Sequence, residues 1–257
     1  MTPHAIAFEK LVAIMNDLRE KCPWDRKQTN ETLRTLTIEE TYELAEAIIH
    51  NNDDEIKKEL GDLLLHIVFY ARIASEKKAF DITDVINNLC EKLIYRHPHI
   101  YGNVKVDNAV QVLENWERLK LNEKGRQKSV LNGVPASLPA VVKANRIQHK
   151  VSGIGFDWEH PSQIWDKVKE EINELQAELD ASDADAIEAE FGDLLFSIVN
   201  AARLFHIDPE TALERTNQKF IKRFAYLEEQ TIKKGIDLKE LTHDEMNVFW
   251  EEAKKKD

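Results

Sequence analysis

One ten-residue segment occurs twice in the chain, as ELGDLLLHIV at residues 59–68 and as EFGDLLFSIV at residues 190–199. The copies are 131 positions apart, and between 59–73 and 190–204 nine of fifteen positions are identical. A repeat of this kind predicts a helical unit of about 100 residues that is built twice, because the period is too long for a solenoid.

Apolar residues recur in both copies at the spacing of an α-helix. In the second copy Leu194, Leu195, Ile198, Val199 and Ala202 follow the i, i+3, i+4 pattern of a helix with a buried face. The chain has only 8 Gly and 7 Pro in 257 residues, which provide few turns for an all-β fold. We therefore predict an all-α fold.

Helix boundaries follow from this periodicity and from start signals. Four starts carry such signals: capping boxes at Thr37–Glu40 and Thr242–Glu245, an N-cap at Ser162, and proline at the first helical position in Asp208-Pro209. The predicted helices are residues 4–20, 36–50, 53–78, 82–96, 108–121, 138–149, 162–180, 184–206, 209–233 and 243–255.

Residues 121–139 collect Gly, Pro, Ser and Asn, which is typical of a linker. The sequence thus predicts an N-terminal domain at 1–120 and a C-terminal domain at 140–257.

Charge and cysteine content exclude several classes of protein. The net charge is −12 and no dense Lys/Arg tract occurs outside the last residues, so we expect no nucleic-acid partner. No segment is apolar enough to span a membrane, and the start does not read as a signal peptide. Two cysteines form no disulfide framework, so we expect a cytoplasmic protein.

Each half has the pattern Glu-Glu-x-x-Glu on one helix and Glu-x-x-Asp at the head of the next. The acids are Glu39, Glu40, Glu43, Glu59 and Asp62 in the first half, and Glu170, Glu171, Glu174, Glu190 and Asp193 in the second. Residues three or four apart share a helix face. Packing of the two helices as a hairpin would therefore bring four carboxylates together across the seam in each half.

Acidic pairs at helical spacing usually form solvated faces, but here all five acids recur in register. Carboxylates held together need a compensating cation, and Mg²⁺ prefers such oxygen ligands. A di-iron site would need Glu-x-x-His on two helices, and the one such pattern, Glu240–His243, lies in a turn-like stretch. The pattern favours a magnesium site.

These acids, with Cys22-Pro23-Trp24-Asp25, the RHPH segment at 96–99 and the GFDW segment at 155–158, resemble the MazG family of nucleoside triphosphate pyrophosphohydrolases over essentially the whole chain. The resemblance implies the all-α NTP pyrophosphatase fold in tandem, usually as an intertwined dimer. It implies Mg²⁺-dependent hydrolysis of nucleoside triphosphates to the monophosphate and pyrophosphate, with broad specificity, as a means of clearing abnormal or surplus nucleotides.

The same resemblance and the helix spacing together suggest roles for individual residues. Glu171, Glu174, Glu190 and Asp193 are the expected metal ligands, Glu170, Glu171 and Glu174 the catalytic residues, and Lys167, Lys219, Arg223 and Trp250 the substrate contacts. Trp250 either stacks on a base or closes the core. No Ser-His-Asp or Cys-His set is evident, so water activated by metal or by Glu170 is the expected nucleophile. One departure is Ala186–Ala189, where the family tends to have a lysine.

The two halves differ at one position that bears on activity. Lys167 aligns with Leu36, so the first half lacks a cation one turn before its acids, although Lys92, Arg96 and Trp116 keep its other contacts. We expect turnover in residues 140–257 and a weaker site in residues 1–120. Because the helices are apolar nearly all round, we also expect a homodimer.

Two other functions fit the same sequence. A non-catalytic helical module could use the acids for structural Mg²⁺ and bind a partner protein. An enzyme of narrow specificity, for example for dUTP or dCTP, would use the same site.

Overall fold

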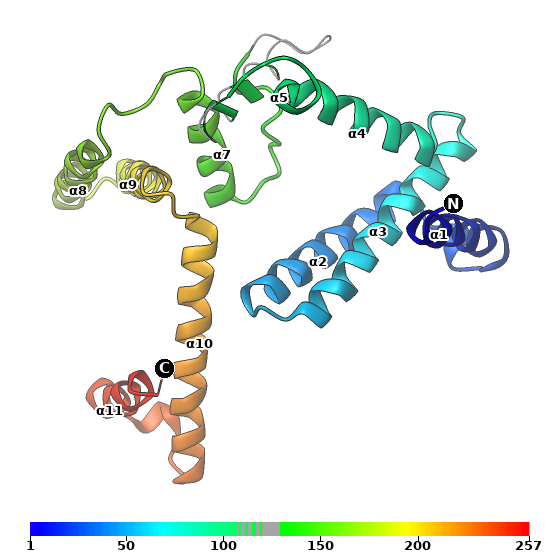
Figure 1. The fold of residues 1–257 in the computed structure, drawn as a ribbon. Helices are drawn as coiled ribbons and strands as arrows, with labels where there is room; N and C mark the ends of the chain where they lie inside the picture. Colours follow the sequence, from blue (N-terminus) through cyan, green and yellow to red (C-terminus); the bar gives the residue numbers. More distant parts are fainter. Residues whose placement is uncertain (107, 109–110, 113–114, 117–118, 120–128, 257) are drawn as a thin grey trace. The chain divides into compact units, whose positions relative to one another are not determined.

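The computed structural model describes residues 1–106, 108, 111–112, 115–116, 119 and 129–256. All regular elements within these residues are helical and none is a strand, which confirms the predicted all-α class. The chain divides into two compact units, residues 1–119 and residues 120–257 (Figure 1).

Unit 1 (residues 1–119) is built around a helical hairpin. Its elements are α1 (Pro3–Lys21), the 3-10 turn η1 (Asp25–Lys27), α2 (Asn30–Ile49), α3 (Asp53–Glu76), α4 (Ile82–Arg96) and the short α5 (Pro98–Tyr101). Helices α2 and α3 form the hairpin, and α1 and α4 both pack against α3 (Figure 1). The short α5 was not predicted.

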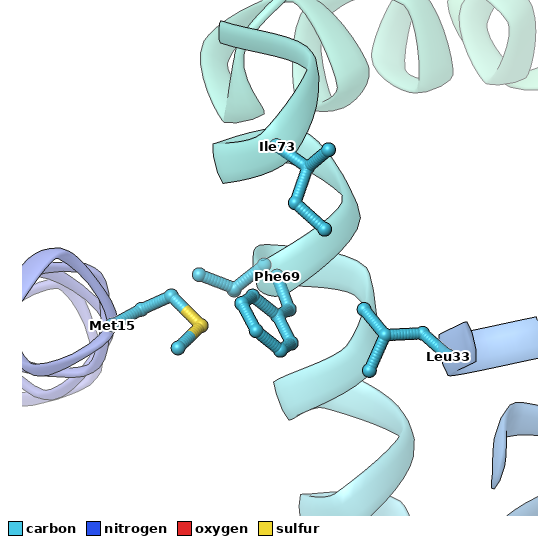
Figure 2. Packing of buried hydrophobic residues seen from close by; sticks show 5 residues of the cluster. Met15, Leu33, Phe69 and Ile73 are labelled. Carbon is cyan, nitrogen blue, oxygen red and sulfur yellow. The ribbon is translucent and has the colours of Figure 1, made fainter. Parts of the chain in front are cut away.

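The core of unit 1 lies where α1, α2 and α3 meet. Met15 of α1 and Leu33 of α2 are each 1% exposed, and they pack with Phe69 and Ile73 of α3 (Figure 2). Burial of such large apolar side chains contributes about 1.5–3 kcal/mol each. This cluster fixes the position of the α2–α3 hairpin relative to α1.

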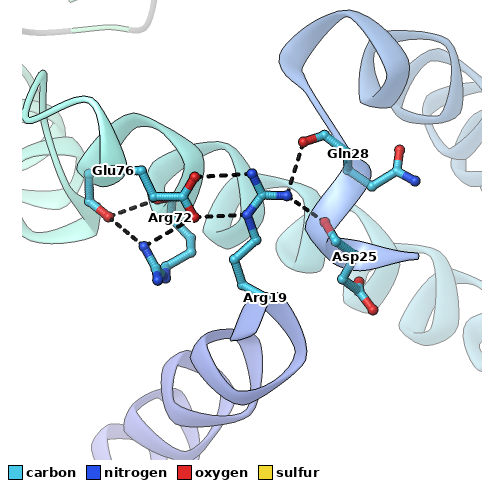
Figure 3. Close-up of polar contacts among 6 residues, drawn as sticks. Arg19, Asp25, Gln28, Arg72 and Glu76 are labelled. Atoms are coloured by element: carbon cyan, nitrogen blue, oxygen red, sulfur yellow. Dashed lines mark hydrogen bonds and ion pairs between the residues drawn. The ribbon is translucent and has the colours of Figure 1, made fainter. Parts of the chain in front are cut away.

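An arginine network fastens the loop after α1 to the end of α3 (Figure 3). Arg19 donates from Nε to Glu76 Oε1 at 2.8 Å and from a terminal nitrogen to Glu76 Oε2 at 3.0 Å. It also donates to the carbonyl oxygens of Asp25 and Gln28, while Arg72 lies 3.3 Å from Glu76. The bond from Arg19 and the nearby positive charges lower the pKa of Glu76.

Helix α2 begins at Asn30 rather than at residue 36, so the predicted capping box at Thr37 and Glu40 is wrong. Thr29 and Thr32 form the capping box instead. Thr37 lies inside the helix, where its Oγ1 donates to the carbonyl oxygen of Leu33. The sequence favours Thr37, which has Glu40 three residues later, whereas Thr29 is followed at that position by Thr32, which takes the place of the usual Glu or Gln.

Unit 2 (residues 120–257) contains a second hairpin and a second helix pair. Its elements are α7 (Ala140–Ser152), the 3-10 turn η2 (Pro161–Gln163), α8 (Ile164–Ala181), α9 (Ala184–Leu204), α10 (Pro209–Lys233), the 3-10 turn η3 (Leu238–Glu240) and α11 (His243–Lys254). Helix α8 packs on α9, and α11 packs on α10. Helix α7 contacts both α9 and α10.

Two of the predicted starts in unit 2 are confirmed and one is wrong. Asp208 caps α10 with Pro209 at its first position, and Thr242 forms the capping box of α11 with Glu245. Ser162 caps no helix, because it lies within η2, and α8 starts at Ile164 without a side-chain cap. The predicted helix at 108–121 falls largely outside the described residues.

The end of the predicted linker is held by a buried lysine. Lys150 of α7 is 6% exposed, and its Nζ donates to the carbonyl oxygens of Val130 at 2.9 Å and Asn132 at 3.1 Å.

Across the described part of the chain, no helix combines the length and apolar character that crossing a bilayer requires.

Candidate active site

Three carboxylates of unit 2 converge across the α8–α9 seam. Glu171 and Glu174 on α8 and Glu190 on α9 each place one oxygen within 4.8 Å of the others. Glu171 is only 5% exposed. Asp193, one turn after Glu190 on α9, is exposed and lies outside this group of three.

The local sequence explains this convergence. Glu171 and Glu174 are three residues apart, so both project from the same face of α8. The turn to α9 uses Ser182 at a φ of 61°, and Asp183 then caps α9 by accepting from the backbone of Asp185 and Ala186. The short connection folds α9 back along α8 and brings Glu190 opposite the two acids of α8.

Lys167 compensates part of this negative charge. Its Nζ lies 2.8 Å from Glu170 Oε1 and 2.8 Å from Glu171 Oε1, and these bonds raise the pKa of Lys167. The pKa of Glu174 is also raised, chiefly by lost hydration, with Lys167 opposing the shift and the charges of Glu171, Glu170 and Glu190 adding to it. The neighbouring carboxylates thus act on Glu174 together, and Lys167 offsets part of their effect.

Unit 1 holds a matching cluster of Glu40, Glu43 and Glu59, again with oxygens within 4.8 Å. Lost hydration raises the pKa of Glu40, followed by the charges of Asp62, Glu43 and Glu59. Glu59 is 2% exposed, and its Oε2 has no hydrogen-bond partner among the described residues. Asp62 lies outside the group of three, as Asp193 does in unit 2. Glu39, like Glu170, precedes the paired acids and lies outside the group.

The predicted substrate residues of α10 and α11 form a separate group. The guanidinium of Arg223 lies 5.8 Å from the centre of the Trp250 ring, and Phe220 packs on the same ring at 4.9 Å. Lys219 lies one turn before Arg223 on α10. Figure 1 shows α10 running away from the α8–α9 hairpin, with α11 on its far half. Within one chain, this group and the acids thus belong to different helix pairs.

The same arginine–tryptophan pair is present in unit 1. Arg96 at the end of α4 lies 5.4 Å from the centre of the Trp116 ring, and His97 packs edge-on against that ring at 4.8 Å. The internal repeat therefore extends to the aromatic and cationic residues.

Comparison with known proteins identifies the family. The model of the MazG nucleotide pyrophosphohydrolase domain matches residues 28–101 and 159–226. The chain belongs to this family. It is 48% identical over 257 residues to the nucleoside triphosphate pyrophosphohydrolase/pyrophosphatase MazG of Thermotoga maritima, covering 99% of this chain and 98% of that protein.

Two further relatives extend the comparison. The nucleoside triphosphate pyrophosphohydrolase of Escherichia coli K12 is 38% identical, with 97% of this chain and 98% of that protein covered. The uncharacterized protein YabN of Bacillus subtilis is 43% identical over 96% of this chain, which spans 51% of that longer protein.

The two matched segments contain both acid clusters. Glu40, Glu43 and Glu59 lie in the first segment, and Glu171, Glu174 and Glu190 lie in the second. Trp250 lies beyond the second segment. The MazG domain therefore occurs twice, each time around one three-carboxylate cluster.

The prediction from the sequence missed one residue at the acid cluster of unit 1. Lys58 on α3 lies 2.8 Å from Glu59 Oε1 and 3.8 Å from Glu55 Oε2, and the bond to Glu59 raises the pKa of Lys58. At the offset of 131 it aligns with Ala189, just as Lys167 aligns with Leu36. Among the described residues, Lys58 of the second hairpin helix contacts the unit 1 cluster and Lys167 of the first hairpin helix contacts the unit 2 cluster. The sequence could have indicated this contact, because Lys58 stands three residues after Glu55 and directly before Glu59.

Proposed function

We propose that this chain hydrolyses nucleoside triphosphates to the nucleoside monophosphate and pyrophosphate, with Mg²⁺ and with tolerance for several bases. The observation that carries the proposal is the three-carboxylate cluster at the α8–α9 seam, which lies within a matched MazG domain. The names of the Thermotoga and Escherichia relatives describe the same activity.

The residues present fit a magnesium ion. Glu171, Glu174 and Glu190 offer hard oxygen ligands from two helices, and Mg²⁺ is commonly held by a few carboxylates plus water and substrate phosphate. The pKa of Glu174 is raised chiefly by lost hydration and further by the charges of Glu171, Glu170 and Glu190, and a bound cation would oppose the effect of those charges. In unit 1 the buried Glu59 has an Oε2 without a hydrogen-bond partner among the described residues. When bound, Mg²⁺ would neutralise phosphate charge and polarise a phosphoryl oxygen.

The remaining chemistry is assigned to the side chains. Glu170, held by Lys167 at 2.8 Å, orients a water and takes its proton as the water oxygen bonds to the α-phosphorus. The bond from that phosphorus to the bridging oxygen breaks, and pyrophosphate leaves. Lys167 is placed to exchange a carboxylate for a phosphate oxygen, and Lys219 and Arg223 stabilise the leaving pyrophosphate.

A homodimer completes this site in our proposal. The α8–α9 hairpin exposes large apolar side chains that a single chain leaves uncovered, among them Ile172 at 49%, Leu195 at 61% and Ile198 at 46%. Phe220 and Ile221 on α10 are similarly exposed at 56% and 65%. Apolar faces of this extent mark interaction surfaces. An intertwined second copy would cover them and bring α10 and α11 of one chain to the acids of the other.

The cellular setting follows from composition. Cys22 and Cys90 are both free, which fits the reducing cytoplasm. The net charge of −12 disfavours nucleic acid as a partner. We propose a cytoplasmic enzyme that acts on free nucleotides, with residues 1–120 and 140–257 as its two domains.

Chelation should abolish turnover, and Glu174→Gln should remove most Mg²⁺ binding from unit 2 while leaving its helices folded. The substitution keeps the size of the side chain but deletes one charged ligand from the cluster. Calorimetric titration with Mg²⁺ and circular dichroism measure the two effects. The exposed Glu188→Gln on α9 is the matched control and should bind Mg²⁺ normally. Full turnover by Glu174→Gln would contradict the metal assignment.

The raised pKa of Glu174 makes a related prediction for the metal-free protein. A carboxyl whose pKa is raised by folding stabilises the fold when protonated, and this stability is lost as the pH rises through its folded pKa. Metal-free Glu174→Gln should therefore melt above the wild type at neutral pH. The difference in Tm should shrink as the pH falls through the raised pKa of Glu174, and saturating Mg²⁺ should reverse its sign at neutral pH.

A further inference from the structure

A buried histidine of unit 1 has no role in the proposed chemistry. His66 lies on α3 and is 7% exposed, and its Nδ1 has no hydrogen-bond partner among the described residues. Buried polar atoms are nearly always paired, because the hydration that they lose must be replaced. Histidine is also the commonest metal ligand in proteins. The ring nitrogen of His66 is therefore a candidate ligand.

His66 lies in the seam of the α2–α3 hairpin, next to the acid cluster of unit 1. Glu59, seven residues before His66 on α3, approaches the acids of α2. Tyr70, four residues after His66, has its hydroxyl 2.7 Å from Thr37 Oγ1 of α2. Residues four and seven apart share a helix face. Because the contacts on both sides of His66 reach α2, its buried imidazole faces the same seam.

Asp62 connects the imidazole with the acids. It stands three residues after Glu59 and four before His66, so the three share one face of α3. Asp62 is half-buried, and its charge adds to lost hydration in raising the pKa of Glu40 on α2. Lost hydration lowers the pKa of His66, and the charge of Asp62 opposes that shift. Asp62 thus acts on both groups, and two ligands four residues apart on a helix can hold one metal ion.

The internal repeat shows that the hairpin does not need these polar groups. At the offset of 131, His66 aligns with Ser197, whose Oγ donates to a carbonyl oxygen of its own helix at 2.9 Å. Thr37 and Tyr70 align with the buried Val168 and Ala201. The seam beside the acids is therefore mainly apolar in unit 2 and polar in unit 1, although both copies form the same hairpin.

A nitrogen ligand changes which ion a site prefers. Carboxylate oxygens suit Mg²⁺, whereas imidazole suits Zn²⁺ and other first-row transition ions. The described cluster of unit 2 offers carboxylates alone. In unit 1 the buried Glu59 has an unpartnered Oε2 on the same helix face as the unpartnered Nδ1 of His66. One oxygen and one nitrogen, both buried, are thus available to the same ion.

We propose that unit 1 binds a first-row transition-metal ion, with His66 as its nitrogen ligand beside the carboxylates of Glu40, Glu59 and Asp62. Zn²⁺ fits such a mixed set of nitrogen and oxygen ligands, and four protein ligands close its tetrahedral shell as in structural zinc sites. The two MazG domains then hold different ions, and the closed site of unit 1 agrees with turnover in unit 2. This inference goes beyond the proposed function, because binding of the ion requires no nucleotide.

Competition calorimetry on the metal-free, full-length chain measures its affinities for Zn²⁺ and Mg²⁺. His66→Ser introduces the residue that unit 2 has at this position, so the hairpin should stay folded in circular dichroism. Its affinity for Zn²⁺ should fall about tenfold or more, because the nitrogen ligand is lost. Its affinity for Mg²⁺ should change by less than about twofold, since the carboxylates remain. The matched control, His4→Ser at an exposed position of α1, should bind both ions like the wild type.

Pulsed electron paramagnetic resonance of bound Mn²⁺ detects a nitrogen ligand directly. The wild type and His4→Ser should show nitrogen coupling, and both His66→Ser and the larger His66→Gln should lack it. Absence of coupling in the wild type, coupling that persists without His66, or Zn²⁺ affinity that both His66 variants retain overturns the proposal. So does a wild type that binds Zn²⁺ no more tightly than Mg²⁺. Failure to release pyrophosphate from ATP would reject the proposed function alone, since neither measurement uses a nucleotide.

Discussion

Glu171→Ala/Glu174→Ala will remove nearly all nucleotide turnover, whereas Glu40→Ala/Glu43→Ala will leave most of it. The first pair removes two of three converging carboxylates in unit 2. Loss of metal-assisted charge stabilisation costs several kcal/mol, so we expect kcat/KM to fall about 10²- to 10³-fold. The second pair removes the equivalent acids of unit 1.

The expected difference in activity between the two units does not come from a missing cation in unit 1. Lys58 gives the unit 1 cluster a positive charge, as Lys167 does in unit 2. The difference lies in what each cation contacts. Lys167 joins Glu170 to Glu171, whereas Lys58 contacts Glu59 and Glu55. Unit 1 thus retains the acids, but its cation pairs with other positions than Lys167 does.

The two variants are assayed side by side for pyrophosphate release from ATP, and circular dichroism checks that both fold. Loss of activity in Glu40→Ala/Glu43→Ala alone would assign turnover to unit 1. Equal partial losses would mean that both units work.

Two inactive variants will restore activity when they are combined in one dimer. Glu174→Gln impairs the acids of α8, and Lys219→Ala/Arg223→Ala impairs the cations of α10. Loss of two charge-assisted contacts costs about 1.5–3 kcal/mol each, so the Lys219→Ala/Arg223→Ala homodimer should lose at least about 100-fold in kcat/KM. The Glu174→Gln homodimer should be inactive because it lacks a charged metal ligand. If the site is shared across the two-fold axis, a heterodimer contains one complete C-terminal site and should show about half of wild-type activity.

Differently tagged chains, co-expressed and purified through both tags, provide the heterodimer. The matched control pairs a wild-type chain with Glu174→Gln and should also be about half active. A heterodimer of the two variants that stays as inactive as its parents would place acids and cations in one chain. A fully active monomer in light scattering would contradict the dimer itself.

Most of the helices could be predicted from the repeated apolar pattern. Apolar spacing and strong caps are local properties, so α4 and α10 were predicted with the bounds that the structure has. The start of α2 was missed because Thr29 and Thr37 both head plausible capping sequences. The choice between them depends on packing, since Leu33 belongs to the core with Met15.

The acids were found from spacing because i, i+3 geometry needs no tertiary information. How closely each approaches the others does need it, and the predicted ligand Asp193 lies outside the group of three that the structure brings within 4.8 Å. The role of Lys58 was missed for the same reason, since it reaches Glu59 from the neighbouring position on α3.

Product analysis of the purified chain with Mg²⁺ and a panel of nucleoside triphosphates tests the central claim most directly. Phosphorus NMR distinguishes pyrophosphate from orthophosphate in the same sample, and a reaction with EDTA provides the blank. Our account predicts equal amounts of nucleoside monophosphate and pyrophosphate from several bases, with no orthophosphate. Nucleoside diphosphate with orthophosphate, or no turnover of any triphosphate, would contradict it.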